Sequence, residues 1–354
     1  MNKKKIYASF FEPENVFDRI NKRNESPWKN MKKQIMDLAN NIGNYHVGLL
    51  YGDWNKLMLT DLEGKEVYEL WEADSIIYAI EFANNDIYFG GWNNTVTKLF
   101  EGKVFKRNYY VSSILGFNNK VYDSGWYGIV ETESGKPVID ESKMEIKDAT
   151  WVDIFLHRGK VGRIGLIDTL FKVKYKGKEM LACGVRYNDD THGIWIVDVE
   201  NQKLLKKIRK YDIKHDSEWQ AFAWNKGEQK IVSCVNLRYI DIDGNKIEET
   251  EINREENIYF YTIHRVVHVV DKNGEEWFYC SRHELVRRYK SKNEQIWWKY
   301  SGSIRRYNLR TGRIEKILGK NVSNEVLALK PVTKEQWDLI FERYEKKFGK
   351  KPKG

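Results

Sequence analysis

The sequence predicts an all-β fold, a six-bladed β-propeller, with seven blades as the alternative. A hairpin of two alternating strands joined by a Gly or Asn turn recurs six times along the 354 residues. A second pair of strands precedes most copies, so each unit holds four antiparallel strands in about 40 residues, which is the size of a propeller blade. The turn residues of the six hairpins are Gly64, Gly102, Gly135, Asn201, Gly244 and Gly312.

The propeller is expected to span 45–330 and to be closed by its own C-terminal strand. The first unit lacks an innermost strand, and residues 324–330 provide an apolar strand at the other end of the repeats. Pairing 326–329 with 47–51 would complete the first blade and remove an exposed sheet edge. Residues 1–44 are expected to form a helical extension, and 331–354 an amphipathic helix with a basic tail.

Both predicted terminal helices are expected to pack on the ring. Ser26-Pro27 places an N-cap before proline at the first helical position. Thr333 and Gln336 have the spacing of a capping box. The second helix carries one apolar stripe, which favours core packing over partner binding. The stripe contains Trp337, Ile340, Phe341, Tyr344 and Phe348.

Aligning the second strands of the blades gives two columns of similar residues. The first column holds only small residues, which suits a crowded position near the ring axis. Its members are Gly52, Gly90, Ser124, Cys183, Cys234 and Cys280. Free cysteine behaves as a small buried apolar residue, so these three are predicted to be structural. Two positions later stand Trp54, Trp92 and Trp126, which are predicted to pack between blades.

The segment 74–92, DSIIYAIEFANNDIYFGGW, resembles a family of uncharacterised archaeal β-propeller proteins. The resemblance covers about one blade and implies the propeller fold. It implies no activity and no functional residues.

Composition excludes several classes of protein. Tryptophan, tyrosine and phenylalanine number 13, 21 and 15, too many for a disordered chain. No stretch approaches the ~18 apolar residues of a membrane span, so no membrane association is expected. The basic start lacks a following apolar segment, and we expect a cytoplasmic protein. Residues 282–320 carry twelve basic and three acidic residues and so form a basic patch. The net charge of this stretch, +9, equals the net charge of the whole chain.

The function is expected on the face that carries the insertions 141–165 and 284–302. This face also bears the connections between blades, and loops on a rigid scaffold commonly form binding sites. The prediction is a non-catalytic scaffold that binds a protein partner there. The alternative is single-stranded nucleic acid bound by the basic, aromatic insertion 284–302, because cations neutralise phosphates and aromatic rings stack on bases. The candidate binding residues are Arg287, Arg288, Lys290, Trp297 and Trp298.

A second alternative is a metal-dependent hydrolase resembling lactonase propellers. Carboxylates and imidazoles at a propeller mouth could hold a divalent ion and activate water. The candidate ligands are Asp189, His192, His215 and Asp216. The sequence contains no HExxH, GxSxG or P-loop motif, and it predicts no cofactor and specifies no small-molecule ligand.

Overall fold

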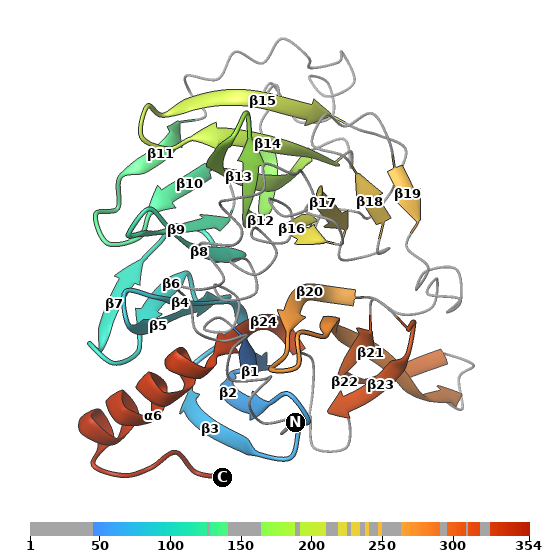
Figure 1. Cartoon of the computed structure of the whole chain (residues 1–354). Coiled ribbons are helices and arrows are strands. Elements are labelled where there is room, and N and C mark those ends of the chain that lie inside the picture. The colour runs from blue at the N-terminus through green and yellow to red at the C-terminus, as the bar shows by residue number, and fades with distance from the viewer. Residues whose placement is uncertain are drawn as a thin grey trace, which may run out of the picture. The chain divides into compact units, whose positions relative to one another are not determined.

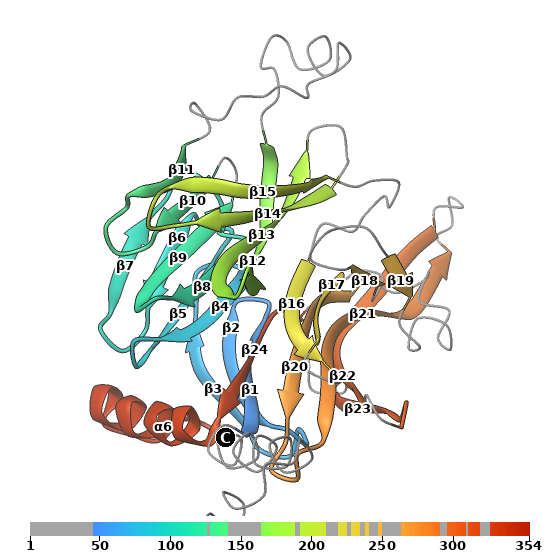
Figure 2. The same ribbon diagram turned by 45° about the horizontal axis from the view of Figure 1, so that its top comes forward.

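The computed structural model describes twelve segments of the chain, and every structural statement below concerns them. The segments are 45–125, 128–140, 164–187, 192–209, 219–224, 228–233, 238–240, 247–249, 263–290, 296–308, 311–318 and 326–354. Their strands lie in one compact unit, His46–Gly354. They form six four-stranded antiparallel sheets (Figures 1 and 2).

Three sheets come from the N-terminal half. The first contains β24 (Val326–Thr333), β1 (His46–Asp53), β2 (Lys56–Asp61) and β3 (Val67–Glu72), in this order. The second contains β4 (Ile77–Ala83), β5 (Asp86–Gly91), β6 (Thr95–Lys98) and β7 (Lys103–Lys106). The third contains β8 (Ser113–Phe117), β9 (Lys120–Gly125), β10 (Gly128–Glu131) and β11 (Pro137–Asp140).

The other three sheets follow the same order. The fourth contains β12 (Ile164–Tyr175), β13 (Lys178–Tyr187), β14 (His192–Asp198) and β15 (Lys203–Arg209). The fifth contains β16 (Trp219–Trp224), β17 (Glu228–Ser233), β18 (Arg238–Ile240) and β19 (Ile247–Glu249). The sixth contains β20 (Ile263–Val270), β21 (Glu276–Lys290), β22 (Ile296–Asn308) and β23 (Ile314–Leu318).

The first strands of consecutive sheets are neighbours around a common axis. Contacts join β24 to β4, β4 to β8, β8 to β12, β12 to β16, β16 to β20, and β20 back to β24. Sequential four-stranded sheets whose inner strands meet around an axis define a β-propeller. The predicted all-β propeller is therefore confirmed.

The C-terminal strand completes the first sheet, as predicted. Strand β24 pairs antiparallel with β1, so that Leu50 faces Lys330 and Gly52 faces Ala328. The first sheet thus holds one strand from the end of the chain and three from the beginning of the ring. This pairing covers the inner edge of β1, which would otherwise expose unpaired backbone groups.

Asparagine pairs make the tightest turns because they tolerate a positive φ. Asn84 and Asn85 have φ of 50° and 59°, and Asn118 and Asn119 have 49° and 59°. These values match the two-residue hairpin turn whose twist suits the flanking strands. Each turn joins the first strand of a sheet to the second.

The predicted column of small residues is buried and crowded. Ser124, Cys183 and Cys280 are fully buried, and both of these cysteines are free. Burial raises the pKa of the Cys183 thiol. A Cβ at Gly90 would lie 3.1 Å from Val111 of the next blade. The structural role predicted for this column is confirmed at these positions, while Cys234 lies outside the described residues.

Within the described segments the only helix is α6 (Lys334–Phe348). Its predicted capping box is present, because the Thr333 side chain accepts from Gln336 N and the Gln336 side chain accepts from Thr333 N. Its apolar stripe packs on the cores of the first two sheets, as predicted. The predicted N-terminal helix, within 1–44, lies outside the described residues. No helix in the described segments is long and apolar enough to cross a bilayer.

One predicted loop is a pair of strands instead. The insertion 284–302 is predicted to be a loop, but β21 extends into it as far as Lys290 and β22 begins within it at Ile296, with Arg287 opposite Lys299. The ladder persists because strand pairing satisfies backbone groups that a loop would leave to water. Of the other insertion, 141–165, only the last two residues are described, and they begin β12.

Candidate functional site

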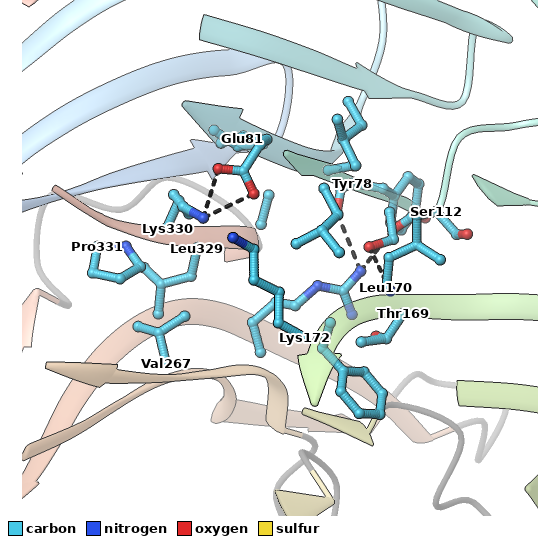
Figure 3. A pocket seen from close by; sticks show the side chains of 18 of the residues that line it. Tyr78, Glu81, Ser112, Thr169, Leu170, Lys172, Val267, Leu329, Lys330 and Pro331 are labelled. Carbon is cyan, nitrogen blue, oxygen red and sulfur yellow. Dashed lines mark hydrogen bonds and ion pairs between the residues drawn. The ribbon is translucent and has the colours of Figure 1, made fainter. Parts of the chain in front are cut away.

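A cavity of about 320 Å³ lies on the propeller axis (Figure 3). Its described walls come from the inner strands β4, β8, β12, β20 and β24. We call this cavity the axial pocket. Its lining residues occupy equivalent levels on different strands.

Strand pairing defines these levels. On the inner strands β4, β8, β12, β20 and β24, one residue pairs with the residue of the small column on the neighbouring second strand. These paired residues lie at the same height along the propeller axis, which we use as a reference level. They are Ala79, Ser113, Leu170, Val266 and Ala328. The residue before this level contributes to what we call the floor of the pocket. The residue two positions after it contributes to what we call the mouth.

Arg265 closes the floor of the axial pocket. Its side chain is only 8% exposed, and its Nη2 donates to the carbonyl oxygens of Ser112 at 2.8 Å and Tyr78 at 3.3 Å. The two acceptors belong to blades that are far from Arg265 in the sequence. The guanidinium therefore ties three blades together at the axis through charge-assisted hydrogen bonds, which are stronger than neutral ones.

Irregular strand pairing accompanies the floor level. Within two residues before the reference level, the ladders of β4, β12, β20 and β24 each leave one residue without a direct partner: Tyr78, Asp168, His264 and Leu327. Bulges of this kind bend a strand and redirect side chains, and they are common next to functional sites. The bulges at Tyr78 and His264 stand beside the hydrogen bond that Arg265 donates to the Tyr78 carbonyl.

The mouth of the pocket carries charged side chains. Lys330 forms an ion pair with the buried Glu81 at 2.6 Å, and Glu81 also accepts from Phe82 N at 2.9 Å. His268 Nε2 lies 2.9 Å from Glu276. The Lys172 side chain is 45% exposed, with Glu179 at 3.7 Å. Because Lys172 and Lys330 are far more exposed than Arg265, we place the opening of the pocket at this level, beside the turns that join first and second strands.

A partly buried histidine, His46, lies close to the mouth residues His268 and Lys330. His46 Nδ1 accepts a hydrogen bond from Val270 N at 3.2 Å. Burial lowers the pKa of His46 to about 4, and the nearby His268 and Lys330 act in the same direction. His46 is therefore neutral at physiological pH and adds no charge to this end of the propeller.

The opposite face of the propeller carries an aromatic cluster in which one exposed ring lies against two partly buried ones. Tyr78, Trp92 and Tyr110 form this cluster, with ring centroids 5.6 to 6.0 Å apart. The Trp92 and Tyr110 rings are stacked at 28°, and Trp92 is 60% exposed. Trp92 lies between β5 and β6, a connection on the same face as the β21–β22 hairpin. The cluster is thus a ready stacking surface.

The predicted packing role of the tryptophan column is wrong where the structure describes it. Trp92 and Trp54 are 60% and 39% exposed, while Trp126 lies outside the described residues. The physical reason is position, because each side chain follows the end of the second strand and projects beyond the sheet. At Trp54 a positive φ of 58° marks the turn itself.

A buried ion pair supports the segment that holds Tyr110. Asp123 is fully buried and accepts from Arg107 Nη2 at 2.6 Å, from Arg107 Nε at 2.8 Å and from the Tyr109 hydroxyl at 2.7 Å. Burial raises the pKa of Tyr109, so it stays a hydrogen-bond donor. Arg107 and Tyr109 thus anchor the connection between the second and third blades.

The structure brings the predicted partner-binding residues together on one hairpin. Arg288 faces Trp298 and Lys290 faces Ile296, with Arg287 and Trp297 on neighbouring rungs. Of the predicted metal ligands, His192 begins β14 opposite Arg186. Asp189, His215 and Asp216 lie outside the described residues. Within the described residues, no group of three or more His, Cys, Asp or Glu side chains could hold a metal ion.

Comparisons with known proteins bear on the fold. No protein-family model and no curated protein matches this sequence. Similar solved structures include an extracellular domain from B. thetaiotaomicron, at 10% identity and TM-score 0.37, with 74% of this chain and 45% of that chain covered. This chain therefore spans less than half of that structure.

Two further solved structures match more completely. The Pseudomonas aeruginosa periplasmic gluconolactonase has 9% identity and TM-score 0.45, with 81% of this chain and 99% of that chain covered. The WD40 β-propeller domain of Doa1 has 11% identity and TM-score 0.37, with 73% and 90% covered. At these values the likenesses carry no argument about activity, and the propeller assignment rests on the strand pairing.

Proposed function

We propose that this chain is a non-catalytic, six-bladed β-propeller that binds a protein partner through the face bearing Trp92. The observation that carries the proposal is the aromatic cluster of Tyr78, Trp92 and Tyr110. Tryptophan and tyrosine dominate the binding energy of protein interfaces, because their large rings bury much apolar area at little cost in side-chain entropy.

The cluster is supported as a docking surface by its rigidity. Tyr110 follows directly after Tyr109, whose hydroxyl donates to the buried Asp123. Tyr78 extends from β4, where its carbonyl accepts from Arg265. A surface that is ordered before binding loses less conformational entropy on association.

The test compares two exposed tryptophans. Trp71, 40% exposed, lies on β3 against Phe348 of α6 and serves as the matched control for Trp92. We expect the wild type and Trp71→Ala to capture the same stoichiometric protein from an extract of the source cells, and Trp92→Ala to lose it. Equal capture by Trp92→Ala, or no protein captured by the wild type, would refute the proposal.

Single-stranded nucleic acid is the second candidate, favoured by the β21–β22 hairpin. Its register places Arg288 opposite Trp298 and Arg287 opposite Lys299, on the same face as the aromatic cluster. Cations beside aromatic rings suit a strand whose phosphates and bases alternate. Fluorescence anisotropy with labelled single-stranded RNA or DNA at two salt concentrations tests this candidate. Steeply salt-dependent binding that is lost in Arg287→Ala/Arg288→Ala supports it, and salt-insensitive or absent binding removes it.

The metal-dependent hydrolase remains a prediction from sequence, because three of its four proposed ligands lie outside the described residues. Equilibrium dialysis with Ca²⁺, Mn²⁺ and Zn²⁺ tests it directly. Stoichiometric binding that is lost in His192→Ala would favour it over the scaffold.

A further inference from the structure

We propose that the axial pocket binds a small amphipathic anion, a molecule with a short apolar body and one carboxylate or phosphate head. This site shares Tyr78 with the aromatic cluster, whereas Trp92 and Tyr110 of the cluster and the cations Lys172 and Lys330 of the pocket belong to one site each. The inference therefore holds or fails independently of the proposed function.

The walls between floor and mouth suit an apolar body. One level after the reference level, each of the strands β4, β8, β12, β20 and β24 contributes a large apolar side chain. These are Ile80, Ile114, Phe171, Val267 and Leu329, and all of them are buried. An apolar ligand body that contacts these side chains leaves water on binding. Each methylene group buried in this way increases the affinity about fourfold.

The charges around the pocket select an anion. The described lining residues include three permanent cations, Lys172, Arg265 and Lys330, and one carboxylate, Glu81. The lining thus has an excess of two positive charges (Figure 3). Glu179 and Glu276, which pair with Lys172 and His268, lie outside the lining; Glu179 is exposed and Glu276 is partly exposed, so water screens both. Walls of low dielectric focus the remaining positive potential into the cavity.

The position of each cation gives the ligand an orientation. Lys172 and Lys330 stand at the mouth, and Lys330 is held there by the buried Glu81. The head of the ligand is therefore expected at the mouth and its apolar body below it, toward Arg265. The volume of about 320 Å³ lies at the lower end of small-molecule sites, so a macromolecular segment is not the occupant.

Isothermal titration calorimetry on the full chain tests the proposal with hexanoate, hexyl phosphate and hexanamide. The amide matches hexanoate in shape and lacks its charge. We expect hexanoate, hexyl phosphate or both to bind, and hexanamide to bind about tenfold more weakly or not at all. Butyrate is expected to bind more weakly than hexanoate, because its body is shorter.

Two variants and a control locate the site. Lys172→Gln removes a half-exposed charge and should weaken binding of the anion by about three- to tenfold. Lys174 is exposed like Lys172, lies two residues further along β12 on the same face, and does not line the pocket. Lys174→Gln should therefore leave binding unchanged. Glu81→Gln/Lys330→Gln neutralises both members of this ion pair, so that no isolated charge is left in the fold and the net charge of the lining is unchanged; it should still weaken binding, because the Lys330 ammonium at the mouth is lost.

Several results would overturn the proposal. Equal affinity for hexanoate and hexanamide would show that charge is not recognised. Equal affinity for inorganic phosphate and hexyl phosphate would show that the apolar walls play no part. Binding that survives both pocket variants would place the anion elsewhere, and no binding of any probe at millimolar concentration would remove the site.

Discussion

Replacing Arg107 with methionine tests whether a buried ion pair holds the platform of the aromatic cluster. Asp123 is fully buried, and Arg107 provides two of its three side-chain donors. Arg107→Met leaves the carboxylate charged in a low-dielectric site with only Tyr109 as a side-chain partner. Removing one member of such a pair destabilises a protein by about 3–5 kcal/mol. That is a large part of the ~5–15 kcal/mol by which domains are stable.

Urea denaturation followed by tryptophan fluorescence measures the effect. The double variant Arg107→Met/Asp123→Asn removes the charge and keeps a hydrogen-bond acceptor for Tyr109, so it should recover a substantial part of the loss. Lys56→Met breaks the solvent-exposed pair with Glu69 and should shift the midpoint far less, because water already screens that pair. A loss below about 1 kcal/mol for Arg107→Met would refute the reasoning.

Three further perturbations have expected outcomes. Gly90→Ala would place a Cβ 2.7 Å from Thr95 O and 3.1 Å from Val111. This overpacking should lower the free energy of unfolding by about 1–3 kcal/mol, measured by thermal denaturation. An unchanged midpoint would show that the neighbouring residues move to accommodate the methyl group. His46 has a folded pKa of about 4 against 6.5 unfolded, so its neutral form stabilises the fold above pH 6.5. This stabilisation, ~2–3 kcal/mol, is lost as the pH falls toward 4, and His46→Asn should flatten the urea midpoint between pH 7 and pH 5. Thr333→Ala removes the cap of α6 and should cost about 1 kcal/mol, seen as faster amide exchange in the first turn of the helix, whereas unchanged exchange would contradict the role of the cap.

Local patterns in the sequence were sufficient for much of the architecture. The Gly and Asn turns, the alternating strands between them and the unit of four strands predicted the propeller. The missing inner strand of the first blade predicted its pairing with residues 326–329, which β24 confirms. The capping box at Thr333 depends on residues three apart and was equally visible.

The candidate sites were less accessible to sequence analysis. Trp92 looked like a core residue, since nothing local shows that the strand ends just before it. Glu81, Lys172 and Lys330 carried no motif that sequence analysis could recognise. A signal did exist, because each of them stands two positions after the inner-strand partner of the small column. That signal can be used only once the pairing of first and second strands is known residue by residue.

The sequence by itself determined the repeating blades, their turns, the closing strand and the capped helix, because each depends on periodicity or on neighbours a few residues apart. Only the tertiary structure decided that Arg265 closes the axis, since its acceptors at Tyr78 and Ser112 lie 187 and 153 residues away. The same holds for the pocket as a whole. Its walls belong to separate blades, and their side chains share a level only because ring closure and strand bulges bring them there.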